Sequence, residues 1–279
     1  MSERDRNLRR APPEKITSLQ NARVKAIRAL DMRKTRRETG LFVAEGAAVL
    51  MSARDVGWDL ETLVYLSGSE DEGATQDLIN WAQLSGAEGL TVNAAVLGKL
   101  AAKDNPQSVL GVFKQRWAGL PAPETVAETE TWLVLEEVRD PGNLGTIIRT
   151  SDAVGVSGII LVGNCCDPYS REALRATMGS VFAVPLVRTD QGAFLSWLED
   201  WVGDVVGLHL EGAEDFRKAD YAGPQLIVMG SEGPGLSDAI SAACSKRVKI
   251  PMSGKLDSLN LAVATALTLY QVRGPNLQL

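Results

Sequence analysis

Three segments of this chain place polar side chains directly after short apolar runs. They are DPGNLGTIIR (residues 140–149), GSEGPGLS (residues 230–237) and IPMSGKLDSLN (residues 250–260). Short apolar runs of this kind predict strands of a parallel sheet that is buried on both faces. Open sheets of parallel strands bind ligands beyond the carboxyl ends of their strands. We therefore expect the three segments to contribute to one ligand site.

The polar side chains in these segments suit hydrogen bonding and charge stabilisation. Asn143 is expected to cap a helix, and Arg149 to project from that helix about one and a half turns further on. Glu232 stands among three glycines, which permit a ligand to approach the main chain closely. Ser258 is a natural N-cap, and Asn260 would lie in the first turn of the last helix. Helix capping, and a surface arginine, are the purely structural alternatives.

The sequence lacks the residues that several other common kinds of catalytic or binding site require. His209 is the single histidine, and no GxSxG segment accompanies it as a hydrolase nucleophile. The glycine segment is neither a Walker loop nor a GxGxxG dinucleotide loop. Cys165, Cys166 and Cys244 have no metal-ligand spacing, so we expect buried free thiols and no bound metal. The chemistry must use carboxylates, hydroxyls, amides, arginine or a carried cofactor.

The charge of the chain is unevenly distributed. The net charge is −6, but residues 1–40 contain 12 Lys or Arg against 5 Asp or Glu, so the remainder is strongly acidic. A basic arm on an acidic body is typical of a tail that binds phosphates, although a solvated tail is an equal alternative on charge alone. No apolar stretch is long enough for a membrane span and no signal segment is evident, which predicts a cytoplasmic protein.

The chain divides into two α/β parts. WAGLPAPETVAETET (residues 117–131) lacks apolar periodicity and predicts a linker. We expect a basic flexible arm at 1–14, an N-terminal α/β domain at 15–117, a linker at 118–130 and a second domain at 131–279. The strands expected before the linker are 41–43, 63–66 and 109–113, and the helices are 47–53, 75–84 and 94–101.

Strand-like and helix-like runs alternate more clearly after the linker, which predicts an open parallel sheet covered by helices. The expected strands are 132–135, 158–162, 182–187, 204–208, 226–229 and 247–250, and the expected helices are 144–154, 171–178, 193–201, 238–243 and 261–272.

The ordered set NLGTIIR, GSEGPGLS and IPMSGKLDSLNLAVATALTLYQ resembles the three motifs of SpoU/TrmH-type RNA methyltransferases of the SPOUT superfamily. SREALRATMGSVFAVPL (residues 170–186) resembles the family's middle segment, so the likeness covers essentially all of 130–273. LFVAEGAAVL (41–50) and NPQSVLGVF (105–113) are similar to the small RNA-binding domain of many members, and this part is less specific.

The resemblance implies a C-terminal domain with a deep trefoil knot, an exception to the rule that folds are unknotted. It implies S-adenosyl-L-methionine held mainly by main-chain groups around Gly230, Ile250, Met252 and Leu259. It further implies a homodimer formed through the knot region.

The same resemblance implies methyl transfer to a ribose 2′-hydroxyl of RNA. It assigns Arg149 to the chemical step, with Asn143, Glu232, Ser258 and Asn260 completing the site. Because arginine is a poor proton acceptor, we favour stabilisation of the developing alkoxide or binding of the adjacent phosphate. The basic arm and extra domain favour large-subunit ribosomal RNA over tRNA. Methylation of a base nitrogen, or a non-catalytic RNA-binding assembly factor, are the alternatives.

Overall fold

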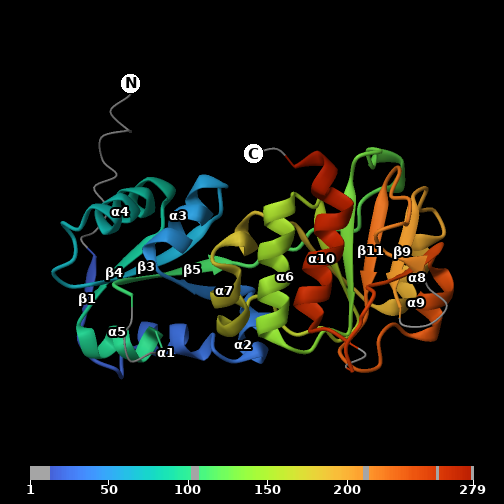
Figure 1. Ribbon diagram of the computed structural model, residues 1–279. Coiled ribbons are helices and arrows are strands. Elements are labelled where there is room, and N and C mark those ends of the chain that lie inside the picture. Colours follow the sequence, from blue (N-terminus) through green and yellow to red (C-terminus); the bar gives the residue numbers. More distant parts are fainter. Residues whose placement is uncertain (1–12, 102–106, 210–213, 256–257, 278–279) are drawn as a thin grey trace. The chain divides into compact units, whose positions relative to one another are not determined.

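The computed structural model describes residues 13–101, 107–209, 214–255 and 258–277 (Figure 1). The chain forms two compact units. One unit runs to Gln115 and also includes Tyr169–Arg171, whereas the other comprises Arg116–Pro168 and Glu172–Leu279. Within the described residues, no helix is long and apolar enough to cross a membrane.

The first unit is a mixed five-stranded sheet with helices on both faces (Figure 1). Its strand order is β1-β4-β3-β5-β2, and β5 is antiparallel to β2 and β3. Helices α1 and α5 share one apolar core with the sheet, whereas α3 and α4 pack on each other. The elements are β1 Glu14–Ile16, α1 Ala22–Ala29, α2 Arg33–Thr39, β2 Leu41–Glu45, α3 Ala47–Asp55, β3 Leu60–Leu66, α4 Gly73–Ser85, β4 Glu88–Val92, α5 Ala94–Ala101 and β5 Val109–Lys114.

The basic stretch near the N-terminus is largely folded. Residues 1–12 of the expected arm lie outside the described residues, and β1 starts at Glu14. Helices α1 and α2 occupy most of residues 22–39, which the sequence analysis treated only as part of a charged stretch. These helices were missed because α1 buries only Val24 and Ile27, and α2 buries only Arg36. Such narrow apolar faces give little periodic signal.

The second unit is a seven-stranded sheet in which all pairings between the named strands are parallel. Its order is β10-β12-β9-β11-β6-β7-β8. Helices α8 and α9 share an apolar core with one face, and α6 and α10 pack together on the other face (Figure 1). The elements are β6 Thr131–Glu136, α6 Pro141–Val154, β7 Gly158–Val162, α7 Arg171–Thr177, β8 Leu186–Thr189, α8 Gln191–Leu198, β9 Asp204–Leu208, β10 Glu214–Asp215, β11 Gln225–Met229, α9 Asp238–Ala243, β12 Lys246–Lys249 and α10 Leu261–Arg273.

One strand of this sheet was placed wrongly from sequence. The expected strand at 182–187 begins only at Leu186, because a 3-10 turn occupies Ser180–Phe182 after Gly179, whose φ is 103°. The segment expected as a linker also packs on this unit. The N–H of Ala118 donates to the carbonyl of Leu186 over 2.8 Å, and the Trp197 indole donates to the carbonyl of Pro121 over 2.8 Å.

Candidate active site

The site is built where helix α6 begins. Asp140, at the end of the loop after β6, caps α6 by accepting the N–H of Asn143 over 2.6 Å, and Pro141 occupies the first helical position. Proline suits that position because its missing N–H would have no partner there. The expectation that Asn143 is the cap is therefore wrong. With Asp140 as the cap, the side-chain amide of Asn143 remains available for other contacts.

Helix α10 begins beside α6 and is capped by Asn260. The Oδ1 of Asn260 accepts the N–H groups of Ala262 and Val263 over 2.9 and 3.3 Å. The sequence analysis expected Ser258 as the N-cap, but Ser258 lies two residues too early. Asn260 keeps its side-chain N–H groups for contacts outside its own helix.

A chain of three side chains joins the three segments. The amide of Asn260 donates to Oδ1 of Asn143 over 3.0 Å, and the amide of Asn143 donates to Oε1 of Glu232. Asn143 therefore uses both ends of its amide to connect residues from the β11–α9 loop and the start of α10. Both helices begin at this point, and Asn143 in the first turn of α6 holds the Glu232 carboxylate there. The sequence predicted that these residues would meet, and the structure brings them together.

The loop that carries Glu232 has a closed shape. The N–H of Ser231 donates to the carbonyl of Gly235 over 3.1 Å, and the N–H of Gly235 donates back to Ser231 over 3.1 Å. A Cβ atom at Gly230 would lie 2.1 Å from the carbonyl carbon of Gly235, so only glycine fits under this fold-back. The closed loop presents Glu232 at its exposed tip.

A buried carboxylate that the sequence analysis missed supports the same loop. Glu136, the last residue of β6, is only 4 % exposed. Its Oε2 accepts the N–H of Ser237 over 2.8 Å, and its Oε1 accepts the Gln191 amide over 3.1 Å. Ser237 ends the glycine loop and caps α9. The available signal was a charged residue ending an apolar strand, because buried charges require partners.

Arg149 and Ser258 lie outside this hydrogen-bonded chain. Arg149 is exposed on α6, and among the described residues its side chain has neither a hydrogen bond nor an ion pair. Arg149 is six positions after Asn143 in the sequence. It therefore lies about 9 Å further along the helix axis and about two thirds of a turn around it. Ser258 is also exposed, and within the part of the chain that the structure describes its side chain forms no hydrogen bond with Asn143 or Glu232. A single protein molecule thus joins only three of the five expected site residues by hydrogen bonds.

The segment expected to hold the cofactor leaves its main chain available. Ile250 directly follows β12 and is half-buried, as is Met252. Within the described residues, no main-chain group of Ile250–Lys255 bonds to another main-chain group. Leu259 is 38 % exposed just before the cap of α10, and Gly230 is buried at the end of β11. Open main-chain groups beside apolar side chains suit a ligand with a flat apolar ring and polar edges.

The cysteines of this unit are not equipped for nucleophilic chemistry. All three are free thiols, as the sequence analysis predicted, although only Cys165 is fully buried. Burial raises the pKa of Cys165 and Cys244 to about 11 and that of Cys166 to about 12. Because the thiolate is the reactive form, these groups are inert at neutral pH. In the parts of the chain that the structure covers, no His, Cys, Asp or Glu cluster suited to a metal is found.

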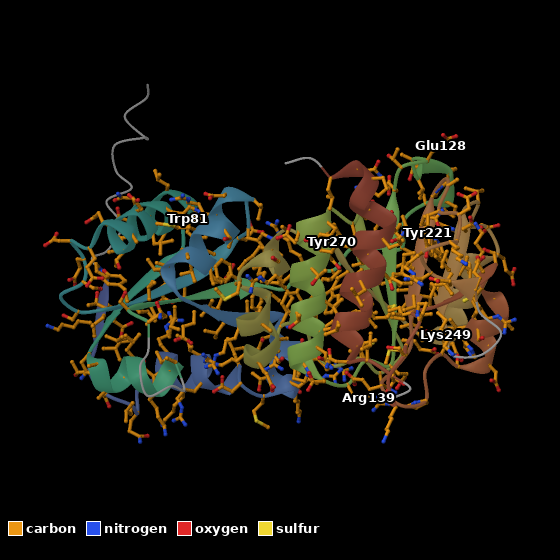
Figure 2. All side chains as sticks on the ribbon, in the orientation of Figure 1. Trp81, Glu128, Arg139, Tyr221, Lys249 and Tyr270 are labelled. Carbon is orange, nitrogen blue, oxygen red and sulfur yellow. The ribbon has the colours of Figure 1, made fainter. Side chains whose placement is uncertain are left out.

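Figure 2 shows Arg139 near the point where α6 begins, at the same end of the sheet as the site.

The fold of the second unit and the hydrogen-bonded chain of Asn260, Asn143 and Glu232 define a parallel α/β domain with a candidate polar ligand site at the carboxyl ends of its strands. Residues 130–270 match the SpoU rRNA Methylase family, and residues 21–111 match the MRM3-like substrate binding domain. The chain belongs to the SpoU rRNA methylase family.

Relatives of known structure or activity cover nearly the whole chain. An AdoMet-bound rRNA methyltransferase from Sinorhizobium meliloti is 43 % identical, with a TM-score of 0.87, over 95 % of this chain and 99 % of that one. The 23S rRNA (uridine(2479)-2′-O)-methyltransferase of Streptomyces viridochromogenes is 31 % identical over 96 % of this chain and 94 % of its own length. The 23S rRNA (guanosine(2553)-2′-O)-methyltransferase RlmP of Bacillus subtilis is 28 % identical over 94 % of this chain and 100 % of its own length.

Proposed function

We propose that this protein transfers the methyl group of S-adenosylmethionine to a ribose 2′-hydroxyl of large-subunit ribosomal RNA. The observation that carries the proposal is the hydrogen-bonded chain of Asn260, Asn143 and Glu232, which unites the three family motifs at one point. Two relatives named as 23S rRNA 2′-O-methyltransferases support this substrate.

S-adenosylmethionine would supply an electrophilic methyl group on its sulfonium. The ribose oxygen would take up this methyl group, the sulfur would keep the electron pair of the bond that breaks, and the hydroxyl proton would pass to solvent water. Glu232, held by Asn143, would accept hydrogen bonds from a ligand hydroxyl or amine. Arg149 would stabilise the developing alkoxide or hold the adjacent phosphate, since a guanidinium remains protonated. Holding both substrates in line supplies much of the rate.

The cofactor would bind at Gly230, Ile250, Met252 and Leu259. The available main-chain groups of residues 250–255 support this assignment, because the relative from Sinorhizobium meliloti binds AdoMet on the same overall fold. A trefoil knot is part of the proposal. After β12 the chain returns past β9 and β11 to place Asn260 against α6, and such a return is required of a knotted C-terminus.

A homodimer completes the proposal. Val263, Leu267 and Tyr270 form an apolar stripe on α10, with 48 %, 44 % and 52 % of each residue exposed. Tyr270 is labelled on this helix in Figure 2. Spacings of four and three residues put the three side chains on one face, which a second copy would cover by two-fold symmetry. The Arg149 side chain has no partner among the described residues, and in the proposed dimer the second copy would complete the site around it.

Changing Leu267 to Lys tests the dimer. The substitution puts a charge at the centre of the stripe, so the protein should become monomeric in sedimentation experiments. Leu84→Lys is the matched control, because Leu84 is 88 % exposed in the first unit. A dimer that survives Leu267→Lys unchanged would remove this interface from the proposal.

Mapping ribose methylation in total RNA from a deletion strain tests the substrate. Loss of one 2′-O-methyl group from large-subunit RNA is expected, and its restoration should require active protein. Loss of a tRNA ribose methyl or of a base methyl would select those alternatives instead. An assembly factor without activity would bind no S-adenosylmethionine in calorimetry. Because the proposed reaction uses no metal ion, methylation activity should survive the addition of a chelator. The proposed rRNA substrate would also place the protein in the cytoplasm.

A further inference from the structure

The first unit separates its charges along the chain. Residues 13–40 contain eight Lys or Arg against three Asp or Glu, whereas residues 41–101 contain two against nine. Helices α1 and α2 therefore carry the positive charge of a unit that is otherwise acidic. An RNA backbone would be repelled by most of this unit and attracted to these two helices.

Internal contacts hold the two helices in a defined arrangement. Arg36 is 4 % exposed, and its guanidinium donates to the carbonyls of Leu30 and Asp31 over 2.8 and 2.9 Å. These two hydrogen bonds join the C-terminal end of α1 to α2. Asp31, the acid in the turn between the helices, is paired with Arg171, so its negative charge is compensated. One arginine is therefore structural, and the turn does not oppose an anion.

Four other cations, in the last turn of α1 and on α2, face solvent. Arg28, Arg33, Lys34 and Arg37 are exposed, and the Lys34 side chain is 82 % exposed. In the described part of the chain, the side chains of Arg28 and Arg37 form no ion pair or hydrogen bond. Arg33 and Lys34 lie in the first turn of α2, where the helix dipole disfavours cations. Lys34 is paired with Glu38 one turn further on, and Arg37 lies in the last turn, where the helix dipole favours a cation, so helix stability accounts for part of this charge but not for Arg33 in the first turn.

We propose that Arg33, Lys34 and Arg37, which line one hollow on α2 together with Glu38, form a surface that binds the phosphate backbone of the substrate RNA. Arg33 and Arg37 lie four residues apart on one face of α2, and Lys34 lies beside Arg33. Phosphate contacts orient a nucleic acid without selecting its sequence, so this surface would orient the RNA for the site in the second unit. The inference rests on the proposed function, because it takes RNA as the substrate.

The test compares two triple variants with the same change in net charge. One replaces Arg33, Lys34 and Arg37 with Gln. The control replaces Arg54, Lys99 and Lys114 with Gln, which lie in the acidic part of the chain or on β5. RNA binding is measured over a series of salt concentrations, with undermethylated large-subunit RNA from a deletion strain as the probe.

The α2 variant should lower the slope of log affinity against log salt by about 3, since each lost phosphate contact lowers it by about 1. It should raise the KM for RNA while leaving the affinity for S-adenosylmethionine and kcat at saturating RNA unchanged. The control should keep the wild-type slope. Equal slopes for both variants, with methylation intact, would overturn the surface. A wild-type protein that neither binds S-adenosylmethionine nor methylates this RNA would instead overturn the proposed function.

Discussion

Replacing Asn143 with Ala removes the central link of the site. The change deletes the donor to Glu232 and the acceptor for Asn260 at once. A neutral hydrogen bond contributes about 1 kcal/mol, and one to a charged group about 1.5–3 kcal/mol. A combined loss of about 3 kcal/mol corresponds to roughly a hundredfold lower rate at 1.4 kcal/mol per tenfold. Folding should be retained, because Asp140 and not Asn143 caps α6.

Single-turnover methylation of undermethylated RNA measures this effect directly. Asn164→Ala is the matched control, since Asn164 is an exposed asparagine just after the neighbouring strand β7. Among the residues that the structure describes, Asn164 forms a hydrogen bond only through its main-chain N–H, so its side chain is expected to be dispensable. A rate for Asn143→Ala within a factor of about three of the control would refute the role given to this amide.

Asn143→Asp separates geometry from charge in the same link. The new carboxylate can still accept from Asn260, but it meets the Glu232 carboxylate instead of donating to it. Two adjacent carboxylates raise the pKa of one of them. As the pH falls through that raised pKa, the pair gains a proton and can share a hydrogen bond. The rate of this variant relative to wild type should therefore rise from neutral to mildly acidic pH, and a constant ratio would contradict the contact.

Substitutions at three further positions test other parts of the second unit. Arg149→Ala should lower turnover by about two orders of magnitude with cofactor binding intact, and Arg149→Lys should also be impaired; near-normal single-turnover rates would end this assignment. Glu136→Gln leaves one acceptor for two donors and should reduce the free energy of unfolding by about 1–3 kcal/mol, whereas an unchanged denaturant midpoint would show that the buried carboxylate is dispensable. Gly230→Ala should be destabilised by about 1–3 kcal/mol, because its Cβ would collide with Gly235, while Gly98→Ala on α5, with open space around it, should not be.

The sequence was sufficient for the architecture of the second unit. Its strands are short apolar runs, and its helices have apolar faces, so most boundaries were predicted to within a few residues. The errors arose where a local contact decided the outcome. Asp140 and Asn260 are the caps because each side chain lies within reach of free N–H groups, whereas Asn143 and Ser258 were equally good caps by residue type alone.

The first unit was harder to predict. Strand β1 has three residues and pairs with β4, a partner more than 70 residues away. Such a strand has no pattern of its own and forms only because β4 offers an open edge. The charge of α1 and α2 was evident from the sequence, but the burial of Val24 and Ile27 against the sheet and the contact between Arg36 and the carbonyls of Leu30 and Asp31 are tertiary features.

The sequence by itself determined which residue types are available for the proposed chemistry, because amides, a carboxylate and an arginine follow the apolar strands and match the three family motifs. Only the tertiary structure decided which of them touch. Asn143 and Asn260 are 117 positions apart, and they meet because the chain returns α10 to the side of α6. Arg149 is on the same helix as Asn143 yet outside the contact, since helical geometry turns it away. Contact depends on the path of the backbone through space, and residue spacing along the chain does not specify that path.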